Sequence, residues 1–193
     1  MNKKLFLTLW ILLLLLIVSA CSEYAPKPRG YFRIEPPQAV YVQLPLEDLP
    51  YSFHVSSLAE IELPPVDDTA GWINVSYPAL GAKIYCTYLS ITPAGLGKVI
   101  EESRLLVSRQ SKDAMSIIEQ AYEDLDKQVY ACLYQLDGAS VSPIQFTLTD
   151  STKNFFRGSL LFNSVTNADS IAPAVQYLKE DIAVLIQSFS WKK

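Results

Sequence analysis

The sequence predicts an α+β domain in which helices pack on a mostly antiparallel β-sheet. One observation is a β-rich first third, where short aromatic and β-branched segments are separated by prolines. Another is the change to helical spacing of apolar residues between residues 92 and 125. The last third then returns to strand-like segments and closes with an amphipathic helix.

Four strands are expected in the first third. Residues 30–34 combine aromatic and β-branched side chains and stop at a pair of prolines. Three more segments of this kind follow, at residues 51–55, 71–77 and 82–89. Because prolines separate them, each strand should be short.

Two helical segments are expected in the middle of the chain. Thr92 and Pro93 open the first one, since proline suits the first turn of a helix. Asp113 caps or begins the second, in which apolar residues from Ala114 to Leu125 recur at helical spacing. The pattern slips between residues 108 and 112, so two helices joined by a turn and one bent helix fit equally well.

The last third is expected to form a meander followed by a helix. Its three strands are predicted at residues 127–135, 142–149 and 154–163. The helix begins at a cap provided by Asp169 or Ser170, and its apolar face extends to Phe189.

The N-terminus resembles the signal of a bacterial lipoprotein. Two lysines precede an apolar run over residues 5–18, which is too short for a helix that spans a bilayer core of about 30 Å. Val18-Ser19-Ala20-Cys21 places small residues before a cysteine, as a lipobox does. Residues 1–20 are therefore expected to be removed. Cys21 would carry diacylglycerol and an acyl chain as a membrane anchor, with no other cofactor.

A tether and one globular domain are expected after the signal. Residues 21–29 contain two prolines and no periodicity, which predicts a flexible tether behind the lipidated cysteine. Residues 30–193 have the size of one ordinary domain. The whole chain has a net charge of −4, and loss of a leader with two lysines and no acid lowers it to −6. Nucleic-acid binding, which normally needs a basic patch, is not expected.

Cys86 and Cys132 lie in expected strands of an exported chain. In an oxidising compartment they can form a disulfide. The alternative is a pair of buried thiols that behave as small apolar residues. Strand order decides between the two and does not follow from the sequence.

No recognisable catalytic or metal-binding motif occurs in the sequence, so the protein is expected not to be an enzyme. His54 is the only histidine, and no nucleophile-elbow motif accompanies it. Cysteine or histidine pairs at zinc-ligand spacing are missing from the sequence. The acidic residues Asp67 and Asp68, and those around Glu123, lack the spaced ligands of a calcium loop. No metal is expected.

Two groups of arginine, aromatic and acidic residues are candidate partner-binding sites, because arginine and aromatic residues are enriched at interfaces. They comprise Arg29, Tyr31, Phe32 and Arg33 beside the tether, and Asp150 and Arg157 in the last expected hairpin. Each group also has a purely structural interpretation. The first would pack an edge strand, and in the second Arg157 would pair with Asp150 across the hairpin.

Five short blocks of sequence carry a family resemblance. They are PKPRGYFRI at 26–34, WINVSYP at 72–78, QFTLTDS at 145–151, FRGSL at 156–160 and SFSWK at 188–192. In this order they resemble the gliding motility lipoprotein GldD family of the Bacteroidetes. The resemblance implies a non-enzymatic envelope lipoprotein that works with protein partners of the gliding and type IX secretion machinery. The order of elements is also similar to that of PsbP-like folds.

Two functions follow from these observations. The first is an accessory or stabilising envelope component on the periplasmic leaflet of the outer membrane, because Ser22 rather than an aspartate follows Cys21. The alternative is a periplasmic domain on the same anchor that binds or hydrolyses a peptide or glycan. A deep pocket that gathers His54, Asp150 and Arg157 would favour the alternative, and a shallow surface the first function.

Overall fold

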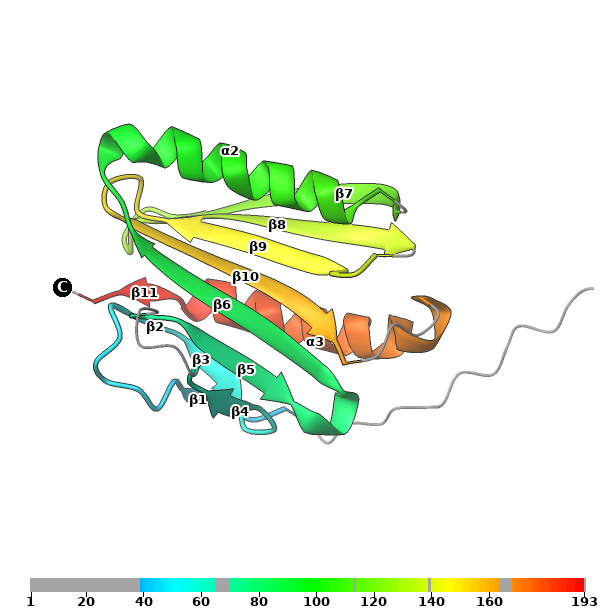
Figure 1. The fold of residues 1–193 in the computed structure, drawn as a ribbon. Helices are drawn as coiled ribbons and strands as arrows, with labels where there is room; N and C mark the ends of the chain where they lie inside the picture. The colour runs from blue at the N-terminus through cyan, green and yellow to red at the C-terminus, as the bar shows by residue number, and fades with distance from the viewer. Residues whose placement is uncertain (1–38, 65–69, 113, 139, 164–167, 193) are drawn as a thin grey trace, which may run out of the picture. The chain divides into compact units, whose positions relative to one another are not determined.

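An antiparallel sheet of seven strands lies at the centre of the structure (Figure 1). This computed structural model describes residues 39–64, 70–112, 114–138, 140–163 and 168–192. The strand order across the sheet is β4-β5-β6-β10-β9-β8-β7. In chain order these strands are β4 (Glu60–Glu62), β5 (Ile73–Tyr77), β6 (Ala82–Ser90), β7 (Ala114–Asp124), β8 (Val129–Gly138), β9 (Ile144–Thr149) and β10 (Asn154–Phe162).

The pairing of β6 with β10 joins the first third of the domain to the last. It runs from Ala82 opposite Phe162 to Ser90 opposite Asn154. A 3-10 turn, η1 (Pro78–Leu80), leads from β5 into β6. The middle of the sheet is therefore made of strands that are far apart in the sequence.

Helix α3 (Ala168–Ser188) and two short ribbons cover one face of the sheet, called here the inner face. The ribbons pair β1 (Tyr41–Gln43) with β3 (His54–Ser56), and β2 (Tyr51–Ser52) with β11 (Ser190–Trp191). Apolar side chains of α3 join those of the sheet in one large core, whose burial is the main stabilising term of the fold. Neither α3 nor any other described helix is long and apolar enough to cross a membrane.

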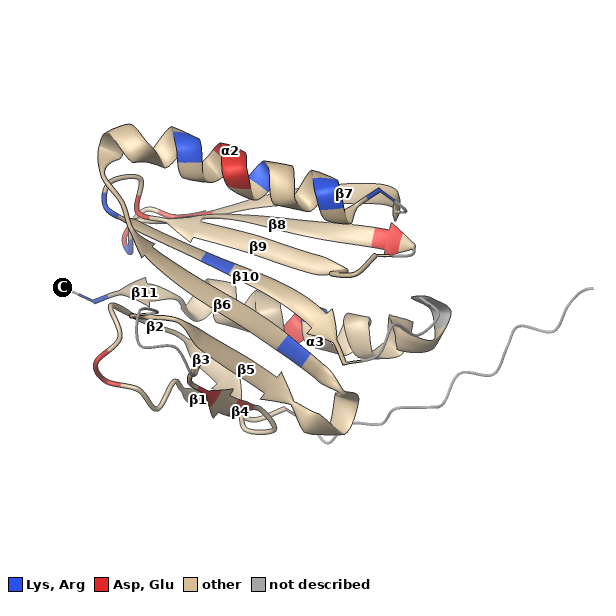
Figure 2. Cartoon of the chain, in the orientation of Figure 1, with Lys and Arg blue, Asp and Glu red and all other residues tan. Residues whose placement is uncertain are grey.

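Helix α2 (Pro93–Gln110) packs on the opposite, outer face. The side chains of β8 alternate between the two faces, as in any strand. Ala131 joins the inner core, whereas Tyr134 packs with Val107 of α2. Charge is sparse in the middle of the sheet, where Lys83 is the single charged residue of β6 and Arg157 that of β10 (Figure 2).

Aromatic rings in the inner core hold the ribbons against the sheet. The Phe156 ring of β10 meets the Tyr51 ring edge-on, with a centroid distance of 4.7 Å. Phe189, which follows α3, stacks on Tyr51 at 5.7 Å, and Trp191 packs edge-on against Phe189 at 4.7 Å. Such pairs each contribute about 0.5–1.5 kcal/mol beyond the area they bury.

The structure confirms the α+β class and most of the expected elements. Strands β5, β6, β8, β9 and β10 coincide with predicted strands, and the last three are neighbours in the sheet, as a meander requires. Residues 51–55 form parts of two strands instead of one, because Phe53 separates β2 from β3. Helix α2 has Pro93 in its first turn, as predicted. The strand expected at residues 30–34 lies outside the described residues.

The helix expected from Ala114 to Leu125 is wrong. Residues 114–124 form strand β7, which pairs with β8 along its length apart from a bulge near Met115. Consecutive residues of a strand point to opposite faces, so Ile117 and Ile118 place apolar side chains on both faces of β7. Apolar residues on both faces imitate a helical pattern in the sequence. The hydrogen-bonded ladder with β8 outweighs that local signal.

Candidate functional site

The candidate site is a hollow of about 640 Å³. Strand β11, which forms part of it, lies near the end of the sheet where the β9–β10 turn is (Figure 1). The β7–β8 turn, the β9–β10 turn and the C-terminal strand β11 form its walls. Its lining residues are Asp126, Lys127, Gln128, Asp150, Lys153, Asn154, Ser190, Trp191 and Lys192. Three lysines against two aspartates give the hollow a positive balance of formal charge.

Asp150 organises the β9–β10 turn. Its Oδ1 accepts hydrogen bonds from the backbone N–H groups of Thr152, Lys153 and Asn154 at 2.8–2.9 Å, and its Oδ2 accepts one from Asn154 Nδ2 at 2.8 Å. Burial acts to raise the pKa of Asp150, but the backbone hydrogen bonds outweigh it and hold the pKa at about 2. Both carboxylate oxygens are thus engaged in the turn, and neither is left to act as a base.

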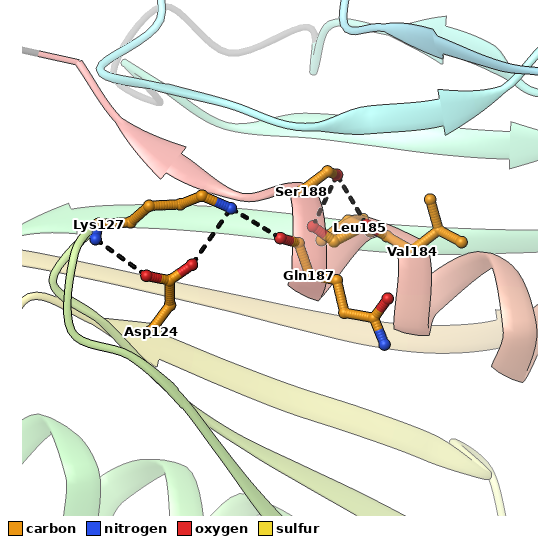
Figure 3. A network of polar contacts seen from close by, with 6 residues as sticks. All are labelled: Asp124, Lys127, Val184, Leu185, Gln187 and Ser188. Atoms are coloured by element: carbon orange, nitrogen blue, oxygen red, sulfur yellow. Dashed lines mark hydrogen bonds and ion pairs between the residues drawn. The ribbon is translucent and has the colours of Figure 1, made fainter.

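Lys127 ties the β7–β8 turn to the end of α3 (Figure 3). Its Nζ donates to the backbone carbonyl of Gln187 at 2.9 Å and lies 3.3 Å from Asp124 Oδ2. A cation at this position also complements the negative end of the helix dipole. One residue on, Ser188 Oγ donates to the Val184 carbonyl at 2.7 Å and accepts a hydrogen bond from His54 N at 2.8 Å.

The third wall is held by Trp191 and Lys192. The Trp191 indole N–H donates to the Gln128 carbonyl at 3.2 Å. Lys192 Nζ donates to the carbonyls of Leu46 and Glu47 at 3.2 and 2.9 Å. Among the lysines of the hollow, Lys153 is therefore the one whose ammonium makes no hydrogen bond or ion pair with the described residues, and it is exposed.

Arg157 does not pair with Asp150, so the expected ion pair across the hairpin is wrong. In the register of the sheet Arg157 lies opposite Thr147 and Thr87, on the outer face. Its guanidinium donates to Gln145 Oε1 at 2.7 Å, and burial lowers its pKa. The reason is the turn itself, because its N–H groups and Asn154 take up the Asp150 carboxylate.

His54, Asp150 and Arg157 are not gathered in one pocket. His54 lies in β3, within the layer that covers the inner face, whereas Arg157 is on the outer face. Asp150 is at the end of the sheet and lines the hollow without the other two. The arrangement that would favour a ligand-binding or hydrolytic domain is therefore not found in the described residues.

Cys86 and Cys132 are free thiols, so the expected alternative of a disulfide is wrong. Two strands, β10 and β9, separate β6 from β8, which places the cysteines about 14 Å apart, well beyond the reach of a disulfide. Cys86 lies in the inner core, whereas Cys132 packs on the α2 side. Burial raises the pKa of Cys132 to about 11, and its thiol donates to Glu119 Oε1 at 3.2 Å.

The remaining predicted site residues lie outside the described part of the chain. They are Cys21, Arg29, Tyr31, Phe32 and Arg33, together with Asp67 and Asp68. Within the described ranges, no group of three or more histidine, cysteine and acidic side chains is placed to hold a metal ion.

The lysines and Trp191 of the hollow were not identified from the sequence as site residues. They come from three separate segments, and none of those segments is a motif on its own. The sequence did contain one signal for this site. Two of the five blocks that carry the family resemblance, 145–151 and 188–192, include residues that line the hollow.

Comparison with known proteins agrees with the resemblance of these blocks. The family model described as gliding motility lipoprotein GldD matches residues 21–191, a range that begins at Cys21 and includes every strand and helix described above. No curated protein matches the chain. The chain belongs to the gliding motility lipoprotein GldD family.

Proposed function

We propose that this lipoprotein is an accessory component of the gliding and type IX secretion machinery, and that it acts by binding another envelope protein and not by catalysis. Membership of the family supports a lipid-anchored envelope protein with a role in gliding. The observation that carries the non-catalytic part is the state of Asp150, whose two oxygens are taken up by four hydrogen bonds of its own turn.

The hollow offers a surface for such binding. Lys153 leaves its ammonium available at the rim, while Lys127 and Lys192 hold the walls in place through backbone carbonyls. The walls mix polar and apolar surface, and Asp150, the half-buried acid among them, is committed to its own turn, which suits a protein contact better than a chemical step. An acidic loop of the partner matches the charge of the hollow.

Position in the envelope follows from the anchor. Cys21 would hold the domain on a lipid, and Ser22 in place of an aspartate favours release to the periplasmic leaflet of the outer membrane. Replacement of Cys21 by alanine should abolish acyl labelling and move an otherwise folded domain out of the membrane fraction. Continued labelling of that variant with palmitate would contradict the anchor.

A crosslinked pull-down from membranes tests the binding role. We expect the tagged protein to recover the same envelope protein in several detergents, and Lys153→Glu to reduce that recovery at least about fivefold. Lys98→Glu on the exposed face of α2 is the matched control with the same change of charge. Recovery of no envelope protein, or equal loss in both variants, would count against the proposal.

A further inference from the structure

Strand β7 is an open edge of the sheet (Figure 1). It is 11 residues long, and among the described residues β8 is its single strand partner. On the side away from β8, every second residue therefore presents a backbone N–H and C=O with no ladder partner in the described sheet. The opposite edge, β4, is only three residues long.

The side chains of β7 are unusually apolar for such an edge. Residues 115–121 are all exposed, with Met115 at 88 %, Ile117 at 49 % and Ile118 at 43 % exposure. Long apolar edges pair readily with other chains, and natural sheets usually shorten, charge or cover them. An edge of this length with apolar residues on both faces indicates a surface that another strand covers.

Two hollows lie under the inner side of this edge, between the strand and α3. The first, of about 460 Å³, is lined by Tyr122, Leu133 and Ile186 among others. The second, of about 340 Å³, lies near the other end of β7 and is lined by Met115, Pro143 and Val175 among others. A strand added beside β7 would direct alternate side chains toward these hollows, so that apolar residues fit on that face.

The outer side of the edge is acidic. Glu119 and Glu123 lie two residues on either side of Ala121 and share the face toward α2. Arg104 of α2 offsets part of the charge of Glu119, whereas Glu123 forms no ion pair with the described residues. An added strand that carries lysine or arginine on this face would be attracted.

The same two glutamates oppose pairing of β7 with a second copy of itself. In an antiparallel pair centred near residue 119, 120 or 121, Glu119 lies opposite or diagonal to Glu119 or Glu123 of the second copy. Like charges in these positions destabilise a sheet. A different, cationic chain is therefore the better occupant.

We propose that β7 is a docking strand, to which an extended segment of a partner protein with alternating cationic and apolar residues adds as an eighth strand. This inference goes beyond the proposed function, because it assigns a second surface, distant in sequence from Lys153, and a defined kind of partner segment. Backbone hydrogen bonds along β7 would supply affinity, while the hollows and the two glutamates would supply selectivity.

Binding of synthetic peptides to the mature lipidated protein in detergent micelles tests the proposal directly. The probe is a ten-residue peptide that alternates valine and lysine, compared with a valine–glutamate peptide and with a scrambled valine–lysine peptide. We expect only the alternating cationic peptide to bind and to slow amide exchange at residues 115–123. Equal binding of all three peptides, or slowed exchange confined to other strands, would overturn it.

Charge variants add a matched control. Glu119→Lys combined with Glu123→Lys should weaken binding of the cationic peptide about tenfold. Glu47→Lys combined with Glu60→Lys makes the same change at exposed positions outside β7, with Glu60 on the opposite edge strand β4, and should leave binding unchanged. Unchanged binding in the β7 double variant would show that the acidic face plays no part.

Photocrosslinking in native membranes identifies the occupant in the cell. A crosslinker at Met115 or Ile118 should join a segment with alternating cationic and apolar residues, and one at exposed Val141 should not. Crosslinks from Met115 or Ile118 to a second copy or to residues 22–38 of the same chain would each overturn the proposal. Crosslinking no stronger than that from the control position Val141 would also overturn it. The effect of Lys153→Glu in the pull-down is independent of this result, so the proposed function and the docking strand fail separately.

Discussion

The hydroxyl of Tyr41 donates a hydrogen bond to Oδ1 of Asp181 at 2.7 Å, which ties strand β1 to helix α3. Asp181 is buried, and its Oδ2 accepts no hydrogen bond from the described residues. Burial raises the pKa of Asp181 above the value of a free aspartate, although contacts with Tyr41 and Tyr77 act to lower it.

The folded protein should lose stability as the pH rises toward neutral, because Asp181 then ionises in a buried position. Replacement of Asp181 by asparagine should reduce this loss. A carboxyl whose pKa is raised by folding stabilises the fold most below its unfolded pKa of about 3.9, and that contribution disappears as pH rises through the folded pKa. Asparagine cannot ionise and still accepts the Tyr41 hydrogen bond. Urea unfolding between pH 4 and pH 8 measures the effect.

In that experiment the wild-type protein should lose more stability than Asp181→Asn as the pH rises. Glu101→Gln, at an exposed position on α2 away from Asp181, is the control and should follow the wild type. If the free energy of unfolding changes with pH in the same way for wild type and Asp181→Asn, ionisation of the buried carboxyl does not destabilise the fold.

Gly158→Ala should destabilise the protein by about 2–3 kcal/mol, because overpacking of a well-filled core costs energy in this range. Gly158 lies opposite Cys86 and Phe146 in the sheet, and a methyl group there would overlap the fully buried Phe146 ring. Denaturant unfolding of the purified variant measures the change.

Gly97→Ala on α2 is the matched control for that substitution. Its added methyl group meets no atom within 4 Å, and alanine favours a helix over glycine, so stability should rise by about 0.5–1 kcal/mol. A neutral Gly158→Ala variant would mean that the Phe146 ring can move at little cost.

Both cysteines of the folded domain should titrate as free thiols after denaturation, with or without prior reduction. In the native protein at pH 8, Cys132 should react slowly with an alkylating reagent and Cys86 not at all. Cys86 is fully buried, and burial raises the pKa of both thiols. Mass spectrometry of the labelled protein shows which of the two cysteines is alkylated first. A thiol count that increases on reduction would reveal a disulfide.

Asp150→Ala should destabilise the domain by about 2 kcal/mol, since it leaves three turn N–H groups without their charged acceptor. Asp126→Ala, at an exposed position in the same hollow, should change stability by less than about 0.5 kcal/mol. Equal effects of the two changes in a denaturant titration would contradict the role of Asp150 in the turn.

The pH dependence of Asp150 has the opposite sign to that of Asp181. Its pKa is lowered to about 2 in the folded protein, so its stabilising contribution is complete above the unfolded pKa of about 3.9 and is lost as pH falls toward 2. The difference in stability between wild type and Asp150→Ala should therefore shrink below pH 4. A constant difference down to pH 2 would exclude the ionised carboxylate as its source.

Local sequence signals were sufficient where one element carries its own pattern. Pro93 and the helical spacing after it predicted α2 because both act within the helix itself. Strands β8 to β10 were predictable because each combines strand-forming residues with a nearby turn. For β7 the local pattern was misleading, since Ile117 and Ile118 occupy both faces and only the distant pairing with β8 fixes their conformation.

The site was harder to predict than the fold, because its residues acquire their roles from contacts distant in sequence. Asp150 and Arg157 belong to one hairpin, and proximity suggested a pair. Their real partners are a turn backbone and Gln145, which depend on which face each strand position occupies. Lys127 likewise has a defined position only because α3 ends beside it, 60 residues later in the chain.

The pairing of β2 with β11 bears on how the chain can be exported. Tyr51 finds its strand partner in Trp191, and the Pro50 carbonyl accepts its hydrogen bond from Lys192 N. In a lipoprotein that crosses a membrane from its N-terminus, β2 emerges long before β11. The aromatic side chains of the first strands therefore stay exposed to solvent until the whole domain has been translocated. A factor that shields the exposed segment would act during this interval. A chain truncated before residue 190 lacks β11 and would leave the segment exposed.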